Sequence, residues 1–174
     1  APLLKAANAG DEDALAKYVG LVNRYETNMD NRSARLISAI SQAKSNNGKA
    51  NVINALSNTP TRNAFLTVGK YLDDKGVSYQ AAVAEKNILK QTQEDIEYDI
   101  VKENMTKAIN IYQTHGTADD GYAVDEIKKM LAEMQPSPIF TLSDEEKKQG
   151  FEILFDGTNL DKWTGNKVGY VPIN

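Results

Sequence analysis

Apolar side chains recur at intervals of three and four residues through most of this chain, which is the spacing of one face of an α-helix. The first example spans residues 11–28, where the apolar positions are Leu15, Tyr18, Val19, Val22 and Tyr25. Asp11 precedes this stripe and can accept hydrogen bonds from the first amide groups, and the early acidic residues suit the positive end of the helix dipole. The pattern predicts an amphipathic helix in a mainly α-helical protein.

The same spacing predicts further helices, which are joined by short polar loops. They are expected over residues 32–45, around Val52 to Leu56, around Phe65 to Leu72, and over residues 78–91, 97–113 and about 119–134. Helices of this length with short connections pack as antiparallel neighbours. Residues 59–76 and 78–91 resemble HEAT-type helices, so a HEAT-like array of helix pairs is expected over residues 1–136. An irregular bundle of paired helices remains the alternative, because the sequence has no fixed period.

Two prolines in residues 134–140 (MQPSPIF) interrupt the helical pattern. Proline favours extended backbone before it and cannot continue a helix, so a domain boundary is expected after residue 136. Residues 137–149 are expected to form a linker with one short helix, because Ser143 and Glu146 have capping-box spacing. Gly150 can end that helix in the left-handed conformation.

After the linker the apolar spacing alternates. Phe151, Ile153 and Phe155 alternate as on a β-strand, and residues 168–173 form a weaker strand candidate that contains a proline. Strands separated from the rest of their sheet present unpaired edges. Residues 151–173 are therefore expected to pack on the helical domain, to pair with a partner protein or a second copy, or to be poorly ordered.

The composition restricts the function classes. The chain has 20 basic and 24 acidic residues among 174, and this balance lacks the basic excess that is typical of nucleic-acid-binding proteins. It contains no cysteine, which excludes disulfides, thiolate metal sites and thiol nucleophiles. No apolar run approaches the roughly 20 residues that span a bilayer. We therefore expect no nucleic-acid partner, no transmembrane segment and no cofactor.

Few residues of the helical part suggest chemistry. His115 is the only histidine, and it could act as a general base or bind a cation together with Asp119 and Asp120. The sequence favours a different interpretation, in which His115 is solvent-exposed and the aspartates begin the next helix, since Thr117 and Asp120 have capping-box spacing. Four carboxylates within residues 93–99 are assigned in the same way to a solvated helix start. No catalytic residue and no metal site is identified here.

The most specific pattern lies in residues 150–165. Eight residues have the order and spacing of the phrase G-F-x-x-L-F-(D/N)-G-x-x-L-x-x-W, namely Gly150, Phe151, Leu154, Phe155, Asp156, Gly157, Leu160 and Trp163. This phrase resembles the opening of the 3-keto-disaccharide hydrolase domain, formerly a domain of unknown function, and residues 142–149 are similar to its lead-in helix. The resemblance implies a concanavalin-A-like β-sandwich that hydrolyses glycosidic bonds of sugars oxidised at the 3-position.

The resemblance also implies a setting. Proteins of this family are abundant in bacteria that scavenge polysaccharides, are typically exported, and in some cases carry a HEAT-like helical region in front. A periplasmic, cell-surface or secreted location is therefore expected, with any export signal removed.

The length of the chain limits what can be carried over from the family. A two-sheet sandwich needs about 100 residues or more, whereas about 35 follow the boundary. Residues 150–174 are thus expected to be the opening strands of an incomplete domain, and carbohydrate would bind through the missing part. Trp163 is the single candidate for sugar contact in this chain, although a position in the sandwich core is the favoured interpretation.

Three functions are consistent with the sequence. The first is a helical accessory region, a scaffold or interaction surface, of a larger carbohydrate-active protein, and such a fragment is expected to be inactive alone. The alternative is a stand-alone helical protein-interaction module without an enzymatic role. A small enzyme built on His115 is the least favoured.

Overall fold

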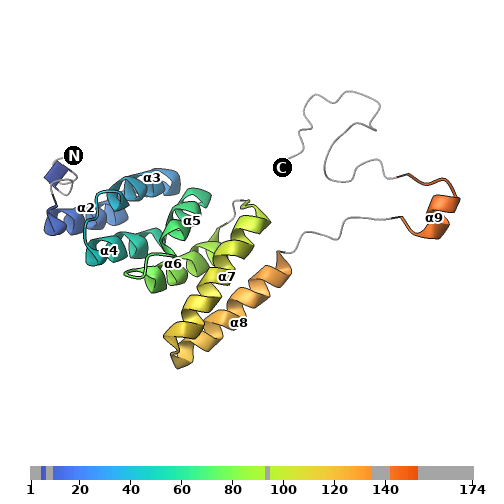
Figure 1. The fold of residues 1–174 in the computed structure, drawn as a ribbon. Coiled ribbons are helices and arrows are strands. Elements are labelled where there is room, and N and C mark those ends of the chain that lie inside the picture. Colours follow the sequence, from blue (N-terminus) through green and yellow to red (C-terminus); the bar gives the residue numbers. More distant parts are fainter. Residues whose placement is uncertain (1–4, 7–9, 93–94, 135–141, 153–174) are drawn as a thin grey trace, which may run out of the picture. The chain divides into compact units, whose positions relative to one another are not determined.

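The computed structural model describes residues 5–6, 10–92, 95–134 and 142–152, and this part of the chain is helical without any strand. The mainly α-helical class predicted from the sequence is therefore confirmed. The chain divides into two units, Ala1–Met134 and Gln135–Asn174 (Figure 1). Residues 153–174, which make up most of the expected β segment, lie outside the described residues.

The first unit contains a succession of short and medium helices (Figure 1). They are α2 (Glu12–Tyr25), α3 (Met29–Ile40), α4 (Asn46–Leu56), α5 (Arg62–Val68), the 3-10 turn η1 (Gly69–Tyr71), α6 (Ser78–Gln91), α7 (Tyr98–His115) and α8 (Ala118–Glu133). Neighbours in sequence pack against one another, and α4 also contacts α2 and α6. None of the described helices is long and apolar enough to cross a membrane.

Polar side chains define where the first four helices begin. Each of these side chains accepts a hydrogen bond from an amide of the following turn, and the residues are Asp11, Asn28, Ser45 and Thr61. Such a bond satisfies an amide that has no partner within the helix. The predicted cap at Asp11 is confirmed. The helix predicted over residues 32–45 is instead Met29–Ile40, because Asn28 caps it earlier and the chain turns after Ile40.

The core of this unit is one continuous cluster of buried apolar side chains. Its largest fully buried members are Phe65, Leu36, Ile53, Leu56, Ile88, Met105 and Ile127, which come from α3 through α8. Tyr18, which the sequence places on the first apolar stripe, is buried as predicted, and Tyr112 of α7 is buried as well. The prediction for Tyr25 is wrong: this residue is the last of α2, where the chain turns away at Glu26, and it is 69% exposed.

The helices α7 and α8 form an antiparallel hairpin, which Figure 1 shows at the end of the first unit. Their connection consists of Gly116 and Thr117. Gly116 has a φ of 72°, and its amide donates to the Tyr112 carbonyl at 3.0 Å, so a left-handed glycine ends α7. A two-residue connection brings the last turn of α7 next to the first turn of α8.

The described part of the second unit contains α9 (Asp144–Lys148). The Glu146 carboxylate accepts from the Ser143 amide at 2.8 Å, which confirms the predicted capping box. The helix closes with two bonds, from the Gly150 amide to the Lys147 carbonyl and from the Phe151 amide to the Glu146 carbonyl, both 3.1 Å. These are the two bonds of a Schellman motif, and Gly150 has the left-handed φ of 83° that the motif requires.

Replacing Gly150 with alanine is expected to reduce the population of α9, since a side chain at positive φ costs about 1 kcal/mol. The measurement is the Cα chemical shift of residues 144–148 in the full chain. Gln149→Ala, one residue earlier and at negative φ, is the matched control and should leave these shifts unchanged. If both substitutions changed these chemical shifts by the same amount, Gly150 would have no special role in ending α9.

Candidate ligand-binding site

One buried carboxylate connects three helices of the first unit. Asp120 lies in the first turn of α8 and is 3% exposed. Its Oδ1 accepts from the Tyr79 hydroxyl of α6 at 2.9 Å. Its Oδ2 lies 2.9 Å from His115 Nδ1, at the end of α7, and accepts from the Thr117 amide at 2.9 Å. Asp120 thus caps its own helix and also holds two side chains from other helices.

The protonation of this cluster follows from these bonds. Burial disfavours the charged form of Asp120, but hydrogen bonds from Thr117, His115 and Tyr79 outweigh it and hold the pKa of Asp120 well below its ordinary value. The carboxylate is therefore ionised at neutral pH and can only accept hydrogen bonds. His115 must then carry a proton on Nδ1, and in the neutral imidazole Nε2 is an acceptor.

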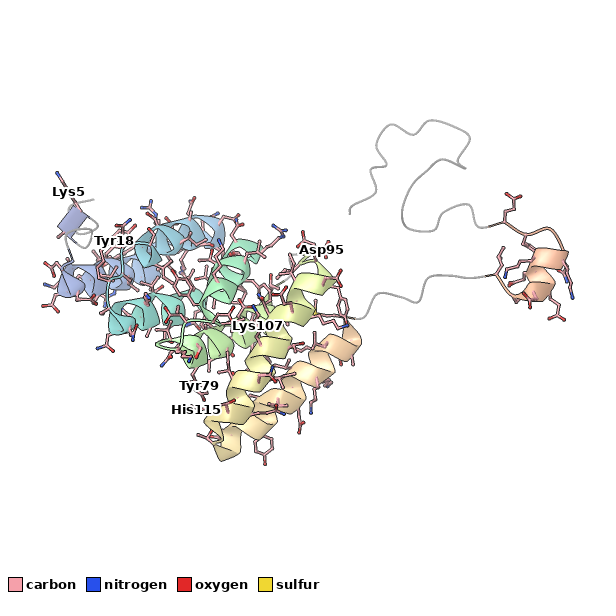
Figure 2. All side chains as sticks on the ribbon, viewed as in Figure 1. Lys5, Tyr18, Tyr79, Asp95, Lys107 and His115 are labelled. Carbon is pink, nitrogen blue, oxygen red and sulfur yellow. The ribbon has the colours of Figure 1, made fainter. Side chains whose placement is uncertain are left out.

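Aromatic contacts fix the orientation of the imidazole. The Tyr79 ring stacks on His115, with ring centroids 3.8 Å apart and an angle of 21° between the planes. Tyr79 also meets Tyr112 edge to face, with centroids 5.7 Å apart. Figure 2 shows Tyr79 and His115 together near the turn between α7 and α8. Burial and the Asp120 carboxylate raise the pKa of Tyr79, so its hydroxyl stays protonated as a donor.

A groove of about 470 Å³ opens beside this cluster, between the start of α6 and the end of α7. This volume is within the range of about 300–1,000 Å³ that small-molecule sites occupy. The lining residues are Lys75, Ser78, Tyr79, Gln80, Asn110, Ile111, Thr114 and His115. The groove is therefore the candidate binding site of the first unit.

The predictions for this region have different outcomes. The Thr117–Asp120 capping box is confirmed. The His115 side chain is 43% exposed, as predicted, but Asp120 and Tyr79 hold it in place. Asp119 is exposed, and the structure brings it into no metal site: among the described residues, no group of three His, Cys, Asp or Glu side chains could hold an ion.

The other candidates from the sequence lie away from the groove or outside the described residues. Asp95, Glu97 and Asp99 are exposed, which agrees with a solvated helix start, and Glu97 pairs with Arg62. Glu94 and Trp163 lie outside the described residues.

Tyr79 is the site residue that the sequence did not reveal. The only local signal is a tyrosine in the first turn of a predicted helix. Its bond to Asp120 joins residues that are 41 positions apart, and no helical periodicity predicts such a contact.

A second carboxyl group is buried in the core, away from the groove. Glu85 of α6 is fully buried, and its Oε2 accepts from Asn104 Nδ2 of α7 at 3.0 Å. No described residue bonds its Oε1. Burial raises the pKa of Glu85 well above its ordinary value, and the bonds from Asn104 and the Gly69 backbone offset this only in part. Glu85 is therefore a carboxylic acid that keeps its proton at pH values where an exposed glutamate has lost it.

Comparisons with family models, with curated proteins and with solved structures find no match to this chain. The assignment of a function therefore depends on the residues and the geometry of this chain.

Proposed function

We propose that this chain is the helical accessory region of a larger exported bacterial carbohydrate-active protein, joined to the start of a domain of the 3-keto-disaccharide hydrolase type. The observation that carries this proposal is the eight-residue phrase from Gly150 to Trp163, which follows a separate helical unit. The helix α9 supports it, because it stands where that family has its lead-in helix, and the left-handed residue that terminates it, Gly150, is the first residue of the phrase.

In this proposal the two units have different roles. The first, Ala1–Met134, is a HEAT-like array of antiparallel helix pairs, as in the α7–α8 hairpin, and acts as a scaffold or interaction surface. The second provides the short helix and the opening strands of a β-sandwich. Hydrolysis of a glycosidic bond belongs to the completed domain, so this chain alone is inactive.

The gene and its longer product test the proposal. In-frame coding sequence for about 200 further residues is expected after Asn174, the size of an ordinary sandwich domain. The longer protein should hydrolyse a 3-keto-disaccharide, whereas residues 1–174 should release no product under the same conditions. A stop codon directly after Asn174, or equal activity of both proteins, would contradict it.

A stand-alone helical interaction module is the alternative, and the surface of α2 favours it. Two large apolar residues of α2 one turn apart, Leu21 and Tyr25, are 46% and 69% exposed. A hollow of about 350 Å³ at Leu21 is lined by Lys17, Gly20, Leu21 and Arg24. Clustered exposed apolar side chains mark protein contact surfaces.

A double variant tests this alternative. Leu21→Ser with Tyr25→Ser should abolish co-purification of a bound protein, whereas Lys128→Ser on the exposed face of α8 should retain it. Unchanged co-purification by the double variant would contradict a contact through α2.

A further inference from the structure

We propose that the groove between α6 and α7 binds a polyhydroxylated ligand of monosaccharide size, with His115 as the central hydrogen-bond acceptor. The groove lies within the first unit, and no residue of the hydrolase-like phrase contributes to it. The inference therefore goes beyond the proposed accessory role and does not depend on it.

The acceptor is His115 Nε2. His115 lines the groove while its Nδ1 is turned to Asp120. The ionised carboxylate accepts from Nδ1–H, so Nε2 is the nitrogen left for a ligand, and in the neutral ring it carries a lone pair. Asp120 and the stacked Tyr79 ring hold this lone pair in one direction. A ligand group that donates a hydrogen bond, such as a hydroxyl, fits this position.

The rim of the groove provides the complementary groups. Among the described residues, the side chains of Lys75, Ser78, Gln80 and Asn110 have no hydrogen-bond or ion-pair partner. Lysine donates, while amides and hydroxyls both donate and accept. Sugar hydroxyls also donate and accept, so vicinal hydroxyls can satisfy these groups and His115 together. Ile111 and the Tyr79 ring add apolar surface for the C–H face of a sugar.

Other ligand classes fit this lining less well. A metal ion would need carboxylate or several imidazole ligands, and no carboxylate lines the groove. An anion would find one lysine, and beside a neutral His115 it would face the Nε2 lone pair. An apolar ligand would bury the polar rim without partners, which costs binding free energy.

The single histidine of the chain makes a direct experiment available. The full chain, labelled with ¹⁵N-histidine, is titrated with glucose, with glucuronate and with inorganic phosphate, each to about 50 mM, since a single small site of this kind binds in the millimolar range. At a pH where the imidazole is neutral, the ¹⁵N shifts before addition should show a protonated Nδ1 and an unprotonated Nε2. Glucose should then move the Nε2 resonance saturably.

Variants separate a binding site from a general solvent effect. Asn110→Ala should weaken glucose binding by about fivefold, the effect of one lost hydrogen bond. Gln113→Ala, on the exposed α7–α8 side and outside the groove, should leave the affinity unchanged. Asp120→Asn should change the ¹⁵N pattern of His115 and weaken binding, because the amide can donate to Nδ1 and move the proton to Nε2. Asp120 is a positioning residue in this scheme.

Several results would overturn the inference. One is the absence of a saturable shift with glucose, and another is an equal effect of Asn110→Ala and Gln113→Ala. A response to phosphate or glucuronate without a response to glucose would show that Lys75 recognises anions and that the hydroxyl assignment is wrong. None of these results would bear on the accessory role, which the reading frame tests separately.

Discussion

Above about pH 5, the free energy of unfolding of the wild-type chain is expected to fall with increasing pH relative to that of the Glu85→Gln variant. Glu85 is fully buried, and its pKa lies well above the ordinary value of 4.5. Above pH 4.5 the unfolded chain releases this proton while the folded chain keeps it. Increasing pH therefore stabilises the unfolded state relative to the folded state. The decrease in the free energy of unfolding approaches about 1.4 kcal/mol per pH unit and ends once the pH exceeds the pKa of Glu85 in the folded chain. Glutamine has the same shape and no proton to release.

A carboxyl group whose pKa is higher in the folded than in the unfolded chain contributes stability that is fully present below its pKa in the unfolded chain. This stability is lost as the pH rises towards its pKa in the folded chain. Urea titrations of both proteins at each pH measure the difference in the free energy of unfolding, which should grow with pH in favour of Glu85→Gln. A constant difference would show that Glu85 is ionised in the folded state.

Glu126 provides the matched control for this experiment. Its carboxylate pairs with Lys86 and Lys90, and these partners lower the pKa of Glu126 to about 2. The stability that it contributes is present above the unfolded pKa and is lost only as the pH falls towards the folded value. Glu126→Gln should therefore differ from the wild type by a constant amount between about pH 5 and pH 8.

The second large effect is expected at Gly69, where alanine should lower the free energy of unfolding by about 1–3 kcal/mol. An added Cβ would collide with the Asn104 amide group, which is the donor to Glu85 Oε2. The backbone itself is not the obstacle, because Gly69 has a φ of −53° that any residue adopts. The cost comes from displacing the half-buried Asn104 side chain, which is the donor to the fully buried Glu85.

Gly20→Ala is the control for this substitution. Gly20 is an interior residue of α2, and an added Cβ there meets nothing within 4 Å. Alanine at such a position should leave the stability unchanged or raise it by up to about 1 kcal/mol. Equal denaturation midpoints for the two variants would contradict the steric account. In the Glu85→Gln background the cost of Gly69→Ala should change, since the two residues share Asn104.

The local part of the fold was predictable because its signals lie close together in sequence. The helix expected over residues 78–91 is Ser78–Gln91, and the caps at Asp11, Ser143 and Thr117 stand where their spacing placed them. The helix predicted over residues 32–45 begins earlier, at Met29, because the Asn28 side chain caps its first turn.

The contacts of the candidate site were not predictable, since they join residues from different helices. Nothing near Tyr79 in the sequence indicates that its hydroxyl meets Asp120. The burial of Glu85 was not predictable from the sequence for a related reason. A single polar residue on a helix normally faces solvent, and only the packing of α6 against α7 and η1 encloses this one.

The shared use of Asp120 ties the groove to the integrity of α8. The same carboxylate caps the first turn of α8 and anchors His115 and Tyr79. If that turn frays, Asp120 no longer holds the His115 imidazole and the Tyr79 hydroxyl, and these two residues that line the groove become free to move. Conversely, a ligand held by His115 would slow hydrogen exchange at the start of α8, so occupancy of the groove could be read from a helix end that the ligand never touches.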